Sequence, residues 1–380
     1  MRRVGPGPRH FGRWRPPPRK NTTMKNTTTT RFRTLLRTRA AAPALGLAAL
    51  ALLALAPSTA LAQTQDLFVS NAGFGNIQRY AGTGPGTFTP TGTTLAGSGL
   101  AFPEGLAFDS RGDLFAAGFD AGTITEFAAG ATAGSLGAGQ TVATGLSGPT
   151  GLAFDPRGNL FVTGFNSGTI TEFMSTGLGT LGTGTTFASG LNNPYGLAVD
   201  ARGDLLVANY GANTISEFAF NAVTGTFGAA QTVATGVSSP TGLAVNARGD
   251  LFVSNNTANT ITEFAAGATP GTFATTGTIF ATGLSSPDGL AFDALGNLYV
   301  ANFSRFITKF AFTPGVNGAA GTFAAGQDIV TGVSAPTFLA FSPVPAVPEA
   351  STTVSFGLLL VLGLGGLVVS ARRRKAASAL

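Results

Sequence analysis

The chain has 380 residues and a formal net charge of +6, with no cysteine and a single histidine, His10. Beyond the N-terminal extension it therefore offers no disulfide, no thiolate or imidazole metal ligand, and no Ser-His-Asp or Cys-His catalytic set. The charge is unevenly spread, because residues 63–348 carry 7 basic against 16 acidic side chains. This excess of acidic groups argues against nucleic acid as a partner. Any metal site would consist of oxygen ligands only, which suits calcium or magnesium.

Residues 1–62 have the features of an export signal. Residues 1–23 are rich in Arg and Pro and are expected to be disordered, or to precede a true start at Met24. A basic region, an apolar run over 40–56 and the small-residue site Ala60-Leu61-Ala62 follow. This order predicts a secretory signal peptide cleaved after Ala62, with Sec-type export machinery and signal peptidase as partners. The alternative is an uncleaved N-terminal anchor.

Residues 63–343 contain one phrase repeated five times. Gly105-Leu106-Ala107-Phe108 opens the first copy, and the opening glycine recurs as Gly151, Gly196, Gly242 and Gly289, at intervals of 45 to 47 residues. A period of this length, with several short strands in each unit, is typical of propellers and solenoids.

Each unit is predicted to form four strands. The first carries Gly-Leu-Ala-Phe and the second Leu-Phe-Val. The third covers 123–127, 169–173 or 260–264, and the fourth covers 141–145 or 232–236. The first two strands lack a polar face, which fits sheets packed on both sides. A tight turn joins them, and its glycine is expected to adopt positive φ. These glycines are Gly112, Gly158, Gly203, Gly249 and Gly296.

The two ends of this region hold complementary halves of a sixth unit. Residues 66–71 match a second strand whose first strand is missing, and residues 336–341 match a first strand without a second. We therefore predict an all-β fold, a six-bladed β-propeller with four-stranded blades whose last blade is closed by the N- and C-terminal strands. Closure of this kind removes exposed sheet edges.

The repeat also predicts which side chains meet on one face. The residue before each strand-one glycine would ring the mouth, giving Glu104, Thr150, Tyr195, Thr241, Asp288 and Thr337. The ends of the second strands would add Phe119, Phe165, Tyr210 and Phe303 on the same face, with Ala72 and Asn256 completing that ring. We take Tyr195 and these four aromatic residues as candidate ligand-binding residues that could stack on sugars. The alternative is that they pack between blades.

Two acids in the mouth ring are candidate metal ligands. Glu104 and Asp288 could hold calcium together with Asn209, Asn255 or Asn302 and waters, or could be solvated loop acids. No cofactor is certain, and calcium is the one considered.

Three turns contain the tripeptide Arg-Gly-Asp, at 111–113, 202–204 and 248–250. The same position elsewhere holds Arg-Gly-Asn or Leu-Gly-Asn, so the turn requires the glycine and the tripeptide is incidental. Asp109, Asp155, Asp200 and Asp293 begin these turns, where an aspartate can bond backbone amides.

After a break at 342–345, residues 344–380 have the features of a sorting segment. Residues 354–370 are apolar and just long enough for a transmembrane helix, and Arg372 to Lys375 fix the following end in the cytoplasm. With Pro348-Glu349-Ala350 in front, this end resembles the PEP-CTERM signal of proteins exported by Gram-negative bacteria that make extracellular polysaccharide. The resemblance implies membrane attachment, processing by an exosortase near Pro348 and Glu349, and a cell-surface or extracellular location. The alternative is a plain C-terminal anchor.

The repeated body resembles the NHL and SMP-30/gluconolactonase-like propellers, most clearly over 287–301. In the SMP-30-like lactonases a Glu-Gly glutamate and a Pro-Asp-Gly aspartate bind a divalent ion with an asparagine. Glu104-Gly105 and Asp288-Gly289 match this pattern, whereas Thr241 departs from it. The first hypothesis is an exported, non-enzymatic binding or scaffold module for exopolysaccharide or a surface protein. The alternative is a calcium-dependent lactonase or lyase using Glu104 and Asp288, although the body has no His to act as acid or base.

Overall fold

The computed structural model describes residues 64–95, 100–132, 134–177, 180–269, 271–315 and 321–344. The expected signal peptide with Ala62, the processing residues Pro348 and Glu349, and the expected helix at 354–370 lie outside these residues. Within the described ranges no helix is long and apolar enough to cross a membrane.

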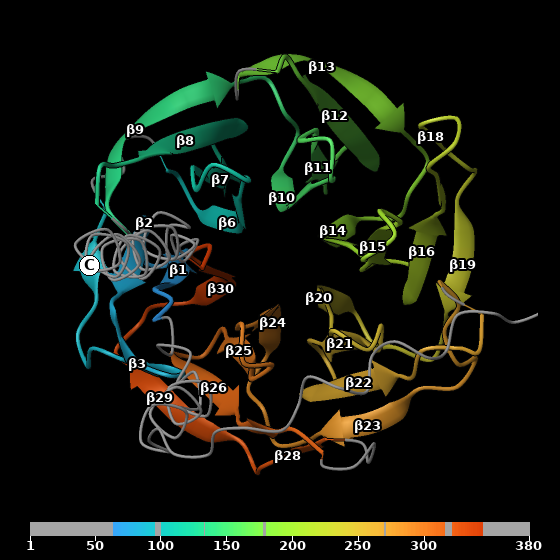
Figure 1. The fold of residues 1–380 in the computed structure, drawn as a ribbon. Coiled ribbons are helices and arrows are strands. Elements are labelled where there is room, and N and C mark those ends of the chain that lie inside the picture. The colour runs from blue at the N-terminus through green and yellow to red at the C-terminus, as the bar shows by residue number, and fades with distance from the viewer. Residues whose placement is uncertain are drawn as a thin grey trace, which may run out of the picture. The chain divides into compact units, whose positions relative to one another are not determined.

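The described chain forms six four-stranded antiparallel sheets arranged around an axis, as predicted (Figure 1). We number these blades in chain order, from the inner strand outward. Blade 1 contains β6 (Pro103–Phe108), β7 (Leu114–Gly118), β8 (Thr123–Ala129) and β9 (Leu136–Ala143). Blade 2 contains β10 (Pro149–Phe154), β11 (Leu160–Gly164), β12 (Thr169–Ser175) and β13 (Leu181–Ala188). Blade 3 contains β14 (Pro194–Val199), β15 (Leu205–Asn209), β16 (Thr214–Phe218) and β19 (Gln231–Ala234).

The remaining blades follow the same plan. Blade 4 contains β20 (Pro240–Val245), β21 (Leu251–Asn255), β22 (Thr260–Phe264) and β23 (Thr278–Ala281). Blade 5 contains β24 (Pro287–Phe292), β25 (Leu298–Asn302), β26 (Phe306–Phe310) and β29 (Gln327–Thr331). Blade 6 contains β30 (Pro336–Phe341), β1 (Leu67–Asn71), β2 (Asn76–Tyr80) and β5 (Thr93–Thr94). Three small hairpins connect third and fourth strands: β3 (Gly82–Gly84) with β4 (Thr87–Phe88), β17 (Phe220–Asn221) with β18 (Thr226–Phe227), and β27 (Phe312–Thr313) with β28 (Thr322–Phe323).

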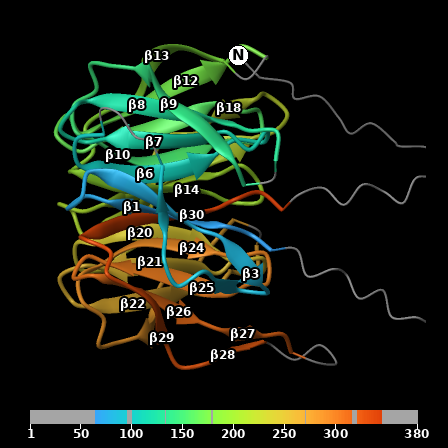
Figure 2. The same ribbon diagram turned by 90° about the vertical axis from the view of Figure 1, so that its left-hand side faces the viewer.

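Blade 6 closes the ring, because β30 pairs with β1 (Figure 2). The ladder runs antiparallel from Leu67 opposite Phe341 to Asn71 opposite Pro336. Ser70 strengthens the closure: its hydroxyl lies 2.8 Å from that of Thr337 and accepts a 2.8 Å hydrogen bond from the backbone amide of Phe338. The predicted joining of the two chain ends in one sheet is confirmed.

The core lies between neighbouring blades. The second strand of each blade, such as β1 or β15, is buried along its whole length, in agreement with the absence of a polar face. This packing explains the repeated glycine in the first strands of blades 1 to 5. A Cβ added at Gly105 would lie 2.1 Å from the carbonyl oxygen of Thr150, and one at Gly242 would lie 2.2 Å from that of Asp288. Adjacent blades therefore approach so closely that no side chain fits at these positions.

The turn between the first and second strands has the predicted geometry. Gly112 has φ +88°, and Gly158, Gly203, Gly249 and Gly296 have φ between 82° and 88°. Oδ1 of Asp109 accepts hydrogen bonds from the backbone amides of Arg111 and Asp113, each at 2.9 Å. The side chain of Arg111 pairs with Asp109, Asp113 and Glu126 of its own blade. The Arg-Gly-Asp tripeptide is thus part of an internally bonded turn.

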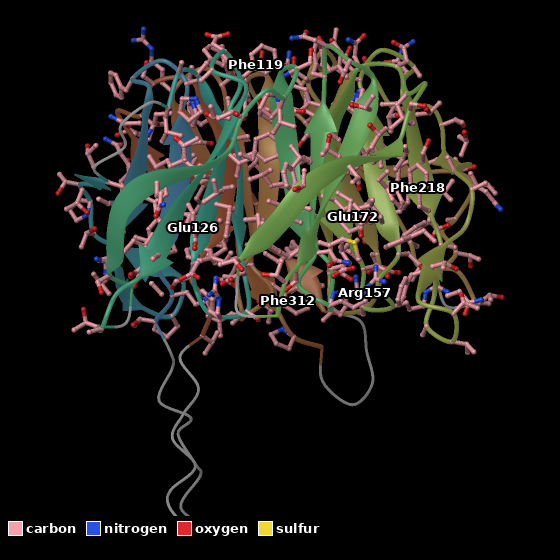
Figure 3. All side chains as sticks on the ribbon, turned by 90° about the horizontal axis from the view of Figure 1, so that it is seen from above. Phe119, Glu126, Arg157, Glu172, Phe218 and Phe312 are labelled. Atoms are coloured by element: carbon pink, nitrogen blue, oxygen red, sulfur yellow. The ribbon has the colours of Figure 1, made fainter. Side chains whose placement is uncertain are left out.

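The loops fall on two opposite faces. Figure 3 shows Phe119, between β7 and β8, on one side of the ring, and Arg157 and Phe312 on the other. We call the side with Phe119 the mouth face and the side with the glycine turns the turn face. Thr64 and Val344, the first and last described residues, line one cavity with Arg111 and Gly112 of a glycine turn and therefore lie on the turn face.

Candidate functional site

The six residues that precede the strand-one glycines divide into two alternating sets. The threonines of blades 2, 4 and 6 each donate a hydrogen bond to the carbonyl oxygen of the proline that opens the next blade. These bonds run from Thr150 to Pro194, from Thr241 to Pro287 and from Thr337 to Pro103, at 3.3, 3.1 and 2.9 Å. Their hydroxyls are thus committed to joining blades. The side chains of blades 1, 3 and 5 are left to meet across the axis.

These three side chains, Glu104, Tyr195 and Asp288, form one cluster, which we call the axial triad. The Tyr195 hydroxyl lies 2.9 Å from Oε2 of Glu104 and 3.3 Å from Oδ2 of Asp288. Glu104 and Asp288 are each only 3% exposed. Since their blades are not neighbours, these contacts bridge the middle of the ring.

Burial controls the protonation of the axial triad. Burial, and then the charge of Asp288, raise the pKa of Glu104 well above its usual range, and the hydrogen bond from Tyr195 only partly offsets this. Burial raises the pKa of the Asp288 carboxyl to about 8. Burial and the two nearby carboxyl groups also raise the pKa of the Tyr195 hydroxyl well above its usual value. Burial thus favours the protonated, neutral form in this pair of carboxyl groups. A neutral carboxyl explains how Oδ1 of Asp288 stays buried without a hydrogen-bond partner, since burying a neutral oxygen costs less than burying a charged one.

Phe338 packs beside the axial triad. It stands in blade 6 where the other five blades have glycine, and its ring stacks on that of Tyr195 with centroids 5.9 Å apart and planes at 14°. Phe338 is 9% exposed. The middle of the propeller is therefore occupied by packed aromatic and carboxyl groups.

The axial triad does not fit a calcium ion as arranged. The Tyr195 hydroxyl occupies the position between the two carboxyl groups, and a calcium ion requires six to eight oxygen ligands. A calcium ion would bind an asparagine through its Oδ1 atom. In Asn255 and Asn302 this atom accepts a hydrogen bond from the backbone amide of Ser238 or Ser285, at 2.9 and 3.1 Å, and the Nδ2 groups of Asn209, Asn255 and Asn302 donate to hydroxyls of the neighbouring third strand, at 2.8 to 3.0 Å. Within the part of the chain that the structure describes, no group of three or more His, Cys, Asp or Glu side chains could hold a metal.

Four aromatic rings form a continuous arc on the mouth face above blades 1 to 3. We call it the aromatic arc; it runs from Phe102 through Phe119 and Phe165 to Tyr210, with successive ring centroids 6.2, 6.2 and 5.9 Å apart. Phe165 and Tyr210 also contact Tyr195, at 5.9 and 6.2 Å, which joins the arc to the axial triad. The structure thus brings together four of the five predicted ligand-binding residues. Phe303 is 39% exposed on blade 5, and no described ring contact links it to the arc.

Phe102 occupies a strained backbone position. The residue before the opening proline of each blade has positive φ, and in the other five blades it is Gly148, Asn193, Ser239, Ser286 or Ala335. Phe102 has φ +54° and is 36% exposed. A bulky aromatic residue in the left-handed region is uncommon and costs free energy. Neither burial nor local geometry accounts for Phe102, which makes it a candidate for a functional role.

The sequence comparison of units did not single out Phe102, Phe338 or Phe74. All three departures are visible in the repeat: Phe102 replaces a small residue before proline, Phe338 replaces the strand-one glycine, and Phe74 replaces the alanine or serine that blades 1 to 4 have in the same loop. Phe74 is 55% exposed. A search for departures at each position of the repeat, instead of agreement, would have found them.

The fold and site together define a closed six-bladed β-propeller with a plugged axis and an aromatic mouth face. No protein-family model matches the chain, and no curated protein matches it in sequence. Among solved structures, it is similar in fold to a chain of a nidogen/laminin complex, with 18% identity over 74% of this chain and 99% of that chain and a TM-score of 0.57.

Two further structures come from bacterial proteins. A candidate 6-phosphogluconolactonase from Bacteroides uniformis has 18% identity over 72% of this chain and 84% of that chain, with a TM-score of 0.51. A gluconolactonase from Xanthomonas campestris has 17% identity over 62% and 78%, with a TM-score of 0.47. The two structures with TM-scores of 0.57 and 0.51 indicate a shared propeller fold, which hosts many functions.

Proposed function

We propose that this chain is an exported, non-enzymatic binding module of the cell surface and that the aromatic arc contacts its partner. The arc carries the proposal, because its four neighbouring rings lie on the face opposite the chain ends. Phe102 is exposed, and the other three rings are partly exposed. Export rests on the signal-like residues 24–62 and the sorting-like residues 348–375. With the ends leaving from the turn face, the mouth face would remain open to a partner.

The partner we propose is extracellular polysaccharide. Flat, partly exposed aromatic rings offer apolar faces of the size of a sugar ring, and Tyr210 adds a hydroxyl for hydrogen bonding. A row of rings at roughly even spacing suits a linear polymer better than a compact ligand. The strain retained at Phe102 supports a role for its ring, since asparagine or serine is used at the same position in blades 3 to 5.

A matched pair of variants tests this role. Phe102→Asn removes the ring and relieves the backbone, whereas Ser239→Asn places the same residue in the equivalent slot of blade 4. On an array of bacterial exopolysaccharides we expect the wild type and Ser239→Asn to bind, and Phe102→Asn and Tyr210→Ala to lose at least tenfold of the signal. If no polysaccharide binds, or if both arc variants bind like wild type, the polysaccharide proposal fails. Capture of a surface protein that depends on Tyr210 would then assign the arc to a protein partner.

The alternative, a calcium-dependent lactonase or lyase at Glu104 and Asp288, receives less support. Tyr195 and Phe338 fill the space that a metal and substrate would need, and the three hydroxyls of the threonine set bond backbone carbonyls. A calcium ion retained by the purified protein and lost in Glu104→Gln would reverse this preference.

A further inference from the structure

The turn face contains a repeated joint between neighbouring blades. The second residue of each second strand forms a floor, and the loop between the third and fourth strands of the next blade supplies a plug that packs on it. Examples are Phe227 on Phe161 at 5.4 Å, Phe323 on Phe252 at 6.0 Å and Phe88 on Tyr299 at 5.8 Å. Phe273 packs likewise on the core that contains Leu206. Four joints are therefore filled by a phenylalanine.

The remaining two joints have a smaller plug. The four filled joints use Gly-Thr-Phe, at 86–88, 225–227, 271–273 and 321–323, whereas residues 134–136 read Gly-Ser-Leu and residues 179–181 read Gly-Thr-Leu. Leu136 packs on the core that contains Phe68, and Leu181 packs on the core that contains Phe115. Leucine thus replaces phenylalanine at the joints of blades 6 and 1 and of blades 1 and 2.

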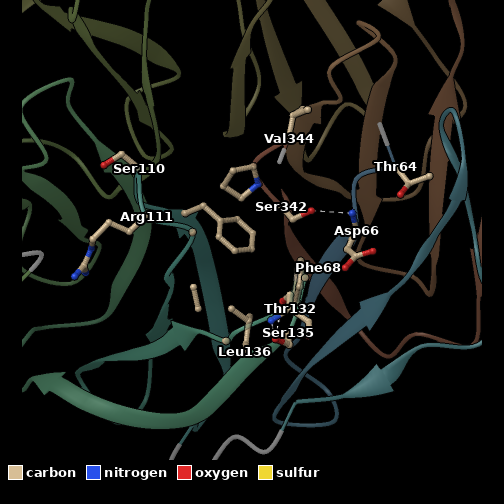
Figure 4. Close-up of a pocket in the computed structure, with 16 residues that line it drawn as sticks. Thr64, Asp66, Phe68, Ser110, Arg111, Thr132, Ser135, Leu136, Ser342 and Val344 are labelled. Atoms are coloured by element: carbon tan, nitrogen blue, oxygen red, sulfur yellow. Dashed lines mark hydrogen bonds between the residues drawn. The ribbon is translucent and has the colours of Figure 1, made fainter. Parts of the chain in front are cut away.

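Cavities lie at both of these joints. One of about 440 Å³ is lined by Phe68, Phe108 and Leu136, between Arg111 on one side and Thr64 and Asp66 on the other (Figure 4). The second, of about 300 Å³, is lined by Phe115, Phe154 and Leu181. A third hollow is formed by residues 219–228 of a single hairpin and reaches no neighbouring blade. Ser110 and Arg111 line both of the first two cavities, so these flank one turn and form a continuous surface.

The filled joints indicate what these cavities accept. At the joint of blades 2 and 3, Arg157 donates a 2.7 Å hydrogen bond to the carbonyl oxygen of Gly225 and lies 5.6 Å from the ring centre of Phe227. At the joint of blades 5 and 6, Lys309 donates a 2.7 Å bond to the carbonyl oxygen of Gly86, two residues before Phe88. Each joint therefore holds an aromatic ring and a main-chain carbonyl two residues earlier. Arg111 occupies in blade 1 the position of Arg157 in blade 2.

We propose that the two cavities flanking Ser110 and Arg111 bind aromatic side chains on a loop of a partner protein, which would complete the joints as Gly-Thr-Phe does elsewhere. This turn-face site is separate from the aromatic arc and goes beyond the proposed function. The chain's own ends are less suited to fill it. Thr64 and Val344 line or adjoin the larger cavity, yet the nearest aromatic residues outside the described ranges are Phe32 and Phe356. Phe32 precedes the expected cleavage site, and Phe356 lies in the expected membrane span.

The chain provides its own probe for this proposal. A fluorescein-labelled peptide of residues 218–229 carries the plug of blade 3, and the same peptide with Phe227→Ala is its control. We expect the first peptide to bind the purified full chain saturably in fluorescence anisotropy, and the control to bind at least tenfold more weakly. No saturable binding, or equal binding of the two peptides, would overturn the proposal.

Filling the cavities is the second arm. The double variant Leu136→Phe with Leu181→Phe should bind the peptide at least tenfold more weakly while unfolding at or above the wild-type temperature. Leu295→Phe, which adds a ring to a turn-face residue that is 47% exposed and outside both cavities, should bind like wild type. Undiminished binding by the double variant would contradict the proposal, and the peptide pair still decides the question if that variant does not fold.

Two further outcomes would show that something other than a partner protein occupies the cavities. If deletion of residues 345–380 strengthens peptide binding at least tenfold, the chain's own tail is the occupant and the partner proposal is wrong. If the wild type self-associates with increasing concentration and the double variant does not, a second copy is the occupant, and the proposal is equally overturned.

Discussion

The hydroxyl group of Tyr195 lies 2.9 Å from Oε2 of Glu104, a residue 91 positions earlier in the chain. The same oxygen lies 3.3 Å from Oδ2 of Asp288. A phenol has one hydrogen to donate, so Tyr195 cannot donate fully to two carboxylates at once. The three groups are complete only when one carboxyl group is protonated and donates a hydrogen bond itself. The protonation state of the axial triad is therefore coupled to the fit of blades 1, 3 and 5.

This coupling predicts a fall in stability at alkaline pH. In the unfolded chain Asp288 loses its proton near its ordinary pKa of 3.8, whereas in the folded protein burial raises this pKa to about 8. Between these values the folded state holds more protons, so its free energy of unfolding decreases as the pH rises, and the Asp288 contribution levels off above the folded pKa. Thermal unfolding at pH 5 and pH 8.5 should give a clear decrease for wild type. The decrease should be smaller in Asp288→Asn, and an unchanged slope would contradict the assignment.

Removing the hydroxyl group of Tyr195 should weaken the axial triad without changing its shape. Tyr195→Phe keeps the stacking on Phe338 and leaves Glu104 and Asp288 without their shared donor. Loss of a buried hydrogen bond of this kind costs about 1–3 kcal/mol. Urea unfolding should show this loss, and Tyr210→Phe, whose hydroxyl lies outside the axial triad, serves as the control. A Tyr195→Phe protein as stable as wild type would show that the hydroxyl contributes nothing there.

The close packing of neighbouring blades predicts that one added methyl group lowers the free energy of unfolding strongly. A Cβ at Gly242 would meet the Asp288 carbonyl oxygen at 2.2 Å and the Leu290 amide nitrogen at 2.9 Å. Since both are backbone atoms, Gly242→Ala requires the blades to separate, and we expect a loss of about 1–3 kcal/mol or more. In Gly137→Ala the nearest atom outside the chain neighbours is 3.5 Å away, and stability should hardly change. Equal stability of the two variants, measured by urea unfolding, would refute this explanation of the repeated glycine.

Ring closure can be tested by truncation. Deleting residues 336–380 removes β30 and exposes the edge of β1, whereas deleting 345–380 leaves blade 6 complete. The first truncation should lose the single cooperative thermal transition or aggregate through the open edge. The second should unfold like wild type. Circular dichroism melting and size-exclusion chromatography distinguish these outcomes, and cooperative melting of both chains would contradict the role given to β30.

Local repetition accounts for what could be predicted from the sequence. The turn glycines, such as Gly112 and Gly158, recur with a fixed spacing, and their positive φ follows from the turn alone. Closure of blade 6 could be predicted because residues 66–71 and 336–341 each match a known half of a unit. The fourth strands were harder. In blades 1 and 2 the pairing with the third strand continues to Ala129 opposite Leu136 and Ser175 opposite Leu181, so β9 begins at Leu136, earlier than the expected 141.

The contents of the site could be predicted only in part. The sequence predicted that Glu104, Tyr195 and Asp288 belong to the same ring of six residues. It did not predict that these three meet across the axis, because this depends on which of the six side chains bond to the neighbouring blade instead. That Asn209, Asn255 and Asn302 bond the third strand also depends on side-chain rotation, which spacing along the chain does not determine. The cavities beside Leu136 and Leu181 could be recognised as incomplete joints only by comparison with the filled joints in the structure.

The pairing of β1 with β30 has a consequence for how the molecule is made. Phe338 and Ser70 are 268 positions apart, so the sheet that locks the ring joins the earliest and the latest strands of the body to be synthesised. Contacts between such distant segments slow the final folding step, because a long intervening chain must be ordered before they form. A ribosome-bound chain that has not yet released residues 336–341 cannot complete the propeller. The last step of assembly therefore belongs to the finished polypeptide.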